Sequence, residues 1–146
     1  MTEEQQEQFQ KLYNEQQAVN ANLEAVRERL EVLQLYLNNY RIGLMVLEEL
    51  AKRAEGDEVL LAVGGGLFVQ ARLRSTAKVF RDIGSGVRIE STVEDAKKYA
   101  QESIASLEKQ YESLSSENQK LSNYVTALNT QLQELVTKIQ RQTRGA

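Results

Sequence analysis

A regular heptad pattern fills the first third of the sequence and limits its fold more than any other feature. In alternating steps of three and four residues from Phe9 to Ala51, every position is apolar except Gln16. The pattern lasts for about six heptads, beyond the three or four that indicate a coiled coil, and no proline interrupts it. It therefore predicts one long helix over residues 4–54, ending near Gly56.

A second heptad pattern of similar length occupies the last third of the chain. It begins at Val93, after Ser91 and Thr92, whose hydroxyls suit a helix N-cap, and it continues to Ile139. It predicts a second helix over residues 92–142. The polar residues Lys97 and Asn118 interrupt it. Asn118 and Gln16 either fix the register of a coiled coil, at a cost in stability, or are tolerated because their side chains reach solvent.

Two helices of similar length, joined by a short segment, lie side by side only as an antiparallel hairpin. At 1.5 Å per residue, each helix of roughly 50 residues is about 75 Å long. This pairing places Phe9 near Ile139 and both chain termini at one distal tip.

The middle of the chain, residues 57–91, has a period of two and predicts four strands. Runs rich in Val, Leu, Ile and Phe cover residues 57–63, 67–73, 78–83 and 87–90. The glycines expected at the turns, where positive φ is needed, are Gly64, Gly65, Gly66, Gly84 and Gly86. The expected fold class is α+β, one domain of residues 1–146 in which a long antiparallel coiled-coil hairpin carries two β-hairpins at one end.

The β-hairpins predict assembly with other chains. Isolated two-stranded hairpins are marginal in water and expose unpaired edges, so partner strands are expected to complete them. Beside the hairpins, the first helix carries Ile42, Met45, Val46 and Leu50 outside its heptad pattern. We expect these four side chains to pack on the β body that the hairpins and their partner strands form.

Composition excludes most catalytic and metal-binding chemistry. The chain has no Cys, His or Trp, so it lacks a disulfide, a thiolate or imidazole zinc site and a Ser-His-Asp triad. The sequence predicts no pocket that would bury a carboxylate and shift its pKa, as acid–base catalysis requires. We therefore expect no enzyme activity, no catalytic residue and no metal.

Other ligand classes are also disfavoured. Each Gly-x-Gly sequence is followed by a strand, whereas a nucleotide-binding loop opens a helix, so no cofactor is expected. A net charge of −3 disfavours nucleic acid as the main partner. No apolar run reaches the roughly 18 residues of a membrane span, and the first residues are acidic and polar, so we expect a soluble cytoplasmic protein without a membrane partner.

The order of elements resembles the alpha-class subunit of prefoldin, of the archaeal type. The resemblance is carried by EVLLAVGGGLFVQARL at residues 58–73 and VFRDIGSGVRIE at residues 79–90, between two equal coiled-coil arms. Beta-class subunits have one hairpin where this sequence predicts two. The family consists of ATP-independent chaperones in which two alpha and four beta subunits join their hairpins in a β-barrel platform.

The resemblance implies roles for particular residues. It assigns assembly with beta-class subunits to the strand runs 59–63, 67–73, 79–83 and 87–89. The residues singled out in these runs are Val59, Leu61, Val63, Leu67, Val69, Leu73, Val79, Ile83, Val87 and Ile89. It assigns the capture of unfolded client proteins, for transfer to a group II chaperonin, to tip residues Phe9, Leu12, Tyr13, Leu132, Leu135, Val136 and Ile139.

Two other functions remain open on the sequence. One is a filament-forming scaffold like the gamma-type prefoldins, in which the same hairpins associate with copies of themselves. The other is a coiled-coil adaptor without chaperone activity. Edges that pair only with a different subunit close a finite ring, whereas self-complementary edges propagate, and the sequence does not separate these cases.

Overall fold

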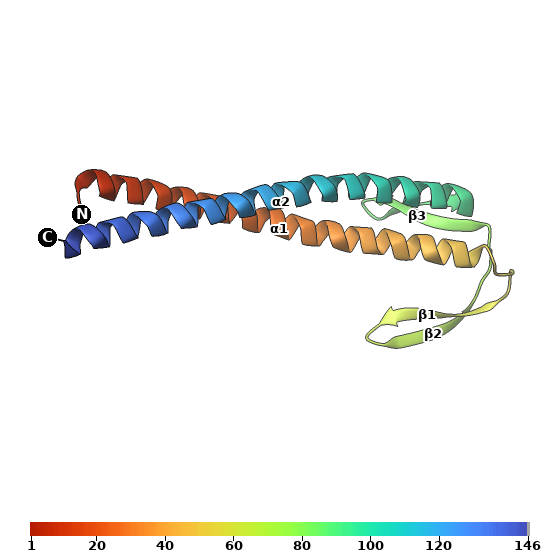
Figure 1. The fold of residues 1–146 in the computed structure, drawn as a ribbon. Coiled ribbons are helices and arrows are strands. Elements are labelled where there is room, and N and C mark those ends of the chain that lie inside the picture. Colours follow the sequence, from red (N-terminus) through yellow and green to blue (C-terminus); the bar gives the residue numbers. More distant parts are fainter. Residues whose placement is uncertain (146) are drawn as a thin grey trace. The chain divides into compact units, whose positions relative to one another are not determined.

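Residues 1–145, as described by a computed structural model, form two long helices separated by two β-hairpins (Figure 1). The elements in chain order are α1 (Glu3–Leu50), β1 (Glu58–Gly64), β2 (Leu67–Arg72), β3 (Lys78–Gly84), β4 (Val87–Thr92) and α2 (Val93–Arg144). Each hairpin is a separate two-stranded antiparallel sheet. The expected fold class, with two long helices and two glycine-turn hairpins, is confirmed.

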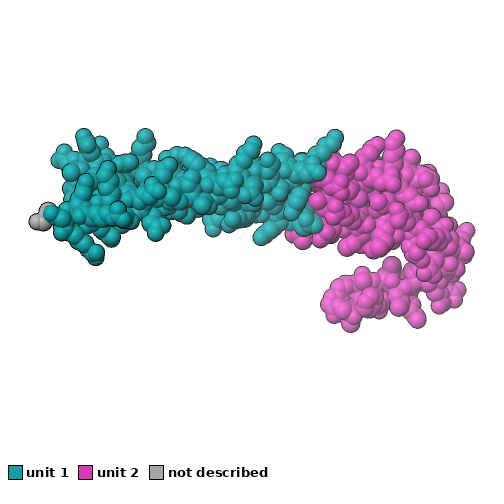
Figure 2. All heavy atoms as spheres, viewed as in Figure 1, with its two compact units in different colours: residues 1–34, 109–146 teal, residues 35–108 magenta. Residues whose placement is uncertain are grey.

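The chain divides into two compact units (Figure 2). The first contains residues 1–34 and 109–146, and the second contains residues 35–108 with both hairpins. In the first unit the helices pair antiparallel, since Gln5 contacts Gln142 and Gln16 contacts Asn129. Both chain ends lie in this unit, as expected.

The buried side chains follow the predicted heptad positions closely. In the first unit they are Val19, Leu23, Val26, Leu128 and Leu135, and in the second they are Leu37, Val93, Ala96 and Ala100. Ala96 is a departure, because the sequence pattern placed Lys97 at the seam. The short Ala96 side chain is buried there, while Lys97 is only half-buried. The seam thus avoids a buried ammonium group, whose desolvation would be unfavourable.

Both helices start at capping residues. Thr2 and Gln5 form reciprocal bonds, in which the Gln5 N–H donates to Thr2 Oγ1 at 3.2 Å and the Thr2 N–H donates to Gln5 Oε1 at 3.0 Å. At α2, the Asp95 N–H donates to Thr92 Oγ1 at 3.1 Å. Thr92 is therefore the N-cap, as the sequence indicated.

Helix α1 ends at Leu50, four residues before the expected boundary at residue 54. Its last turn tightens, because the N–H groups of Lys52 and Arg53 donate to carbonyls only three residues back. The Gly56 N–H, in a residue with φ of 88°, then donates to the Leu73 carbonyl at 2.7 Å. Bonds to the base of the first hairpin thus replace the last helical bonds.

The two hairpins have the same turn geometry. In each, the strand register shifts by one residue just before the turn, between Ala62 and Gly64 and between Asp82 and Gly84. All five turn glycines have positive φ, from 60° to 109°. Glycine adopts these conformations without the steric cost that a Cβ would impose. The two hairpins therefore share the same turn and the same register shift.

Replacing Asn118 by Leu should stabilise the protein. The Oδ1 atom of Asn118 is buried, and no hydrogen-bond partner for it lies within residues 1–145. Asn118→Leu removes this unsatisfied acceptor and makes the seam position apolar, so we expect the free energy of unfolding to rise by about 1–2 kcal/mol. Thermal unfolding at fixed protein concentration measures this change.

Gln16→Leu is the matched control for Asn118→Leu. The Gln16 side chain donates to Asn129 Oδ1 across the helix pair, so its replacement loses a hydrogen bond and should stabilise the protein less. An equal gain from the two substitutions would contradict this account of Asn118.

Within residues 1–145, no helix combines the length and apolar character that crossing a membrane requires.

Candidate functional site

Most of the exposed large apolar side chains of the second unit lie on the two hairpins. Among the ten expected assembly residues, Val59, Leu73 and Val79 are half-buried and the other seven are exposed. Each hairpin contains only two strands, so both of its outer edges present unpaired backbone N–H and C=O groups. Apolar faces and open edges together suit pairing with strands of another chain.

The first hairpin is apolar on both faces. Its register pairs Leu61 with Val69 on one face, where the expected assembly residues lie. The opposite face carries Ala62 paired with Phe68, and also Leu60. Leu60 and Phe68 lie within the runs expected to serve assembly, and a strand with apolar residues at both alternating positions indicates burial on two sides. Leu60 is 67% exposed and Phe68 is 62% exposed.

The second hairpin contacts the start of α2 through a charged residue. The Arg81 guanidinium lies over the Tyr99 ring, 4.1 Å from its centroid. Its Nε atom is buried and lacks a hydrogen-bond partner within the described chain. Desolvation strengthens such cation–π contacts, and this contact therefore connects β3 to α2.

Tyr99 in turn contacts α1. The Tyr40 and Tyr99 hydroxyls are 3.3 Å apart, and their rings meet edge to face with centroids 6.1 Å apart. The hydrogen bond between them raises the pKa of Tyr40 and lowers the pKa of Tyr99. Arg81, Tyr99 and Tyr40 thus link β3, α2 and α1 within the second unit.

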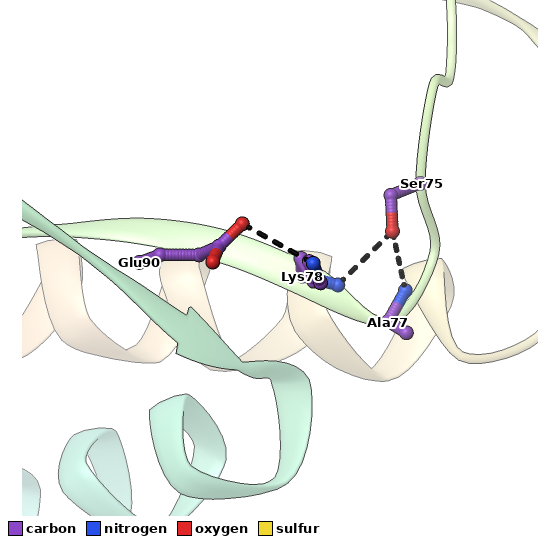
Figure 3. A network of polar contacts seen from close by, with 4 residues as sticks. All are labelled: Ser75, Ala77, Lys78 and Glu90. Carbon is purple, nitrogen blue, oxygen red and sulfur yellow. Dashed lines mark hydrogen bonds and ion pairs between the residues drawn. The ribbon is translucent and has the colours of Figure 1, made fainter.

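Phe80 points to the other face of β3 and is 72% exposed. It is another strongly exposed apolar residue within the runs expected to serve assembly. Next to it, Ser75 Oγ accepts the N–H groups of Ala77 and Lys78, each at 3.2 Å, and Lys78 Nζ lies 3.6 Å from Glu90 Oε1 (Figure 3). These contacts fix the entry into β3.

The distal end of the first unit holds the expected client-binding residues. Leu135 is buried, whereas Phe9, Leu12, Leu132 and Ile139 are half-buried. Tyr13 and Val136 lie outside the heptad pattern and are exposed. Phe9 and Tyr13 stack with ring centroids 6.2 Å apart. The exposed part of the tip therefore contains Tyr13 and Val136 beside partly covered seam residues.

Polar side-chain contacts help to hold this end of the helix pair together. Gln5 Nε2 donates to Gln142 Oε1 at 2.6 Å, and Gln16 donates to Asn129. The Tyr124 hydroxyl donates to Glu15, which raises the pKa of Tyr124. A net hydrogen bond contributes only about 0.5–1.5 kcal/mol, so these polar contacts add modestly to the helix pairing that the buried apolar residues of the seam provide.

Over the described part of the chain, no group of three or more acidic side chains is arranged to hold a metal ion. The hairpins offer exposed apolar area and unpaired strand edges, and the tip of the helix pair offers exposed apolar area.

Comparison with known proteins gives a consistent family. The family model for prefoldin subunits matches residues 19–138, which include both hairpins. The chain is 29% identical over 126 residues to the prefoldin subunit alpha of Archaeoglobus fulgidus, covering 86% of this chain and 90% of that protein. It is 35% identical over 103 residues to prefoldin subunit 5 of Arabidopsis thaliana, covering 63% and 68%.

Solved structures agree on the fold. A filamentous prefoldin from Methanocaldococcus jannaschii matches with a TM-score of 0.56 at 26% identity, covering 91% of this chain and 99% of the other. The prefoldin beta subunit from Thermococcus strain KS-1 matches with a TM-score of 0.58, covering 87% and 90%. At 19% identity, the second likeness concerns the fold alone.

Proposed function

The chain belongs to the prefoldin family, and from this premise we propose that it is an alpha-class subunit of an ATP-independent chaperone in the cytoplasm. Family membership supports a role as a chaperone subunit that assembles with other prefoldin subunits. In the proposal, residues 57–91 of a single domain of residues 1–146 serve assembly. The arms, residues 4–54 and 92–142, present client-binding tips.

Assembly through the hairpins rests on one observation, the exposure of most of their apolar residues. Seven of the ten expected assembly residues are exposed, Leu67 among them at 67%. Such a surface is unfavourable in water at about 25 cal/mol per Å², and burying it in a barrel with beta-class subunits would recover that free energy. We propose two alpha and four beta subunits, as the family resemblance implies.

Client capture at the tips is the second part of the proposal. An unfolded protein presents apolar side chains without a fixed pattern, and Tyr13, Val136 and the half-buried residues around them offer apolar surface without a shaped pocket. Several tips acting on one client raise its affinity through effective concentration. Transfer of the client to a group II chaperonin completes the proposed role, which needs no enzyme activity.

A filament-forming scaffold is the second candidate. The structural match to a filamentous prefoldin from Methanocaldococcus jannaschii favours it, because hairpin edges that pair with copies of themselves would propagate. A coiled-coil adaptor without chaperone activity is the remaining alternative.

Light scattering separates the ring from the filament. The mass is measured for this chain alone and after mixing with a beta-class prefoldin subunit. We expect a single discrete complex near the mass of a hexamer in the mixture. Polydisperse growth of this chain alone, unchanged by the beta-class subunit, would contradict the hexamer and support the filament.

Thermal unfolding tests whether the hairpins need partners. Because binding of a partner to the folded state stabilises that state, the unfolding midpoint should rise with protein concentration and with added beta-class subunit. Circular dichroism at several concentrations gives the midpoint. A midpoint that depends on neither would show that the hairpins are stable without assembly.

A further inference from the structure

The two hairpins are attached to the helices in different ways. The polar contacts that anchor the β1–β2 hairpin in the described chain lie within residues 54–73, at the base of that hairpin itself. Strand β4, by contrast, ends at Thr92 and α2 begins at Val93, so no linker separates them. The Val93 N–H also donates to the Ala77 carbonyl at 2.9 Å. The base of the β3–β4 hairpin is therefore continuous with a helix.

One face of the β3–β4 hairpin is partly covered in the single chain. Arg81 pairs with Ile89 and Val79 pairs with Ser91, so these four side chains share a face. Val79, Arg81 and Ser91 are half-buried, whereas Phe80 on the opposite face is strongly exposed. Because the hairpin is a two-stranded sheet without a second layer, other elements of the unit must cover the first face.

The contact that holds this face is the stack of Arg81 on Tyr99. The guanidinium carbon lies 4.1 Å from the ring centroid, well within the roughly 6 Å range of cation–π attraction. The Nε atom of Arg81 is buried, and no hydrogen-bond partner for it lies within residues 1–145. The ring therefore attracts a cation that has lost water on one side, and such attraction is stronger than at an exposed site.

Tyr99 is in turn held in place from α1. Its hydroxyl lies 3.3 Å from the Tyr40 hydroxyl, and the two rings meet edge to face. Further along the same pair of helices, Arg41 Nη2 lies 2.9 Å from Glu108 Oε1. The ring on which Arg81 stacks thus has a fixed place relative to both helices of the second unit.

We propose that Arg81 is a positioning residue for subunit assembly, because its stack on Tyr99 holds the β3–β4 hairpin in one orientation on the helices before a partner binds. The inference rests on the proposed assembly with beta-class subunits and names a residue that controls it. A hairpin that is already oriented loses less conformational freedom when a partner strand pairs with its edge, so it binds more tightly. This orientation leaves Phe80 and both strand edges open to a partner.

Nuclear magnetic resonance of the chain alone tests the stack without any partner. The Arg81 Nε–H signal should be shifted upfield by the ring beneath it and protected from exchange with water. We expect Tyr99→Leu to remove both effects, because leucine has no ring. Tyr99→Phe should keep both, because it loses only the hydroxyl. A signal that Tyr99→Leu leaves unchanged would show that Arg81 does not stack on Tyr99, and the proposal would be wrong.

Hydrogen exchange of the backbone amides shows whether the stack orients the hairpin. Arg81→Met removes the cation and keeps a long apolar side chain. In this variant the β3–β4 amides should exchange about tenfold faster, while the β1–β2 amides keep their wild-type rates. Arg88→Met is the matched control, because Arg88 is exposed and faces Asp82 across the same hairpin. Equal exchange in the two variants would contradict an orienting role for Arg81.

Association with a beta-class prefoldin subunit tests the consequence for assembly. We expect Arg81→Met and Tyr99→Leu each to weaken association at least tenfold, and Tyr99→Phe and Arg88→Met to leave it near the wild-type value. The double variant Arg81→Met/Tyr99→Leu should associate no more weakly than either single variant, because both remove the same contact. Wild-type association by Arg81→Met, or additive losses in the double variant, would overturn the proposal.

Two checks separate this proposal from folding and from the proposed function. Circular dichroism should show wild-type helix content in every variant, because the buried residues Val93, Ala96 and Ala100 are unchanged. If the wild type forms no complex with the beta-class subunit although the Arg81 signal behaves as expected, the proposed function is wrong, and with it the role of Arg81 in assembly. If the complex forms equally well without the stack, only the role of Arg81 is wrong.

Discussion

Removing residues 1–14 and 132–146 should strongly weaken suppression of client aggregation and leave assembly intact. The deletion takes away all seven expected client-binding residues, while the buried residues Val19, Leu23, Val26 and Leu128 still join the helices. A fully buried large apolar side chain contributes about 1.5–3 kcal/mol, so the loss of several at each tip of this chain should lower the affinity of the whole complex for its client by tenfold or more. Light scattering of a denatured client during refolding gives the readout.

Point substitutions make this result specific. Tyr13→Ser with Val136→Ser removes the two exposed tip residues and should weaken client binding by tenfold or more. Gln17→Ser with Gln140→Ser, at exposed polar positions on the same helices, should leave it unchanged. Unimpaired suppression by the truncated chain, in a complex of normal subunit composition, would rule out client binding at the tips.

Charges on the first face of the β1–β2 hairpin should prevent assembly. Leu61 and Val69 are cross-strand partners, both exposed in the single chain, so Leu61→Asp with Val69→Asp does not disturb a core. In the assembled barrel the same residues would be buried, and unpaired carboxylates there cost several kcal/mol. Each 1.4 kcal/mol of binding free energy changes the dissociation constant tenfold, so we expect association with the beta-class subunit to weaken more than a hundredfold.

The control for this variant is Arg88→Gln. Arg88 is exposed and faces Asp82 across the β3–β4 hairpin, so its replacement should not change association. Circular dichroism should show the same helix content in both variants and in the wild type. A complex of wild-type mass formed by Leu61→Asp/Val69→Asp would show that assembly uses another surface.

Most of the fold could be predicted because its signals are local. The heptad patterns, the Thr92 cap and the glycine turns each depend on residues close together in sequence, and they specified element type and order. The residues at which the helices end could be predicted less closely. Helix α1 ends at Leu50 because Gly56 bonds to Leu73, seventeen positions away, and no local pattern records that bond.

The candidate site was only partly predictable, for a related reason. Leu60, Phe68 and Phe80 lie within the strand runs that the resemblance assigns to assembly, but their strong exposure depends on what the other elements cover. The contact of Arg81 with Tyr99 joins β3 to α2 and leaves no trace in hydrophobic periodicity. The exposure of Ile42, Met45 and Val46 likewise depends on where the strands lie.

The sequence by itself determined that this protein is two long helices around two glycine-turn hairpins, because helical and strand periodicities arise from backbone geometry that every local segment shares. Tertiary structure alone decided which side chains meet across elements. Ala96 rather than Lys97 enters the seam, Arg81 stacks on Tyr99, and Ile42, Met45 and Val46 of α1 stay exposed. Such outcomes depend on the register and position of segments far apart in the chain, where a difference of one residue changes which side chain is buried.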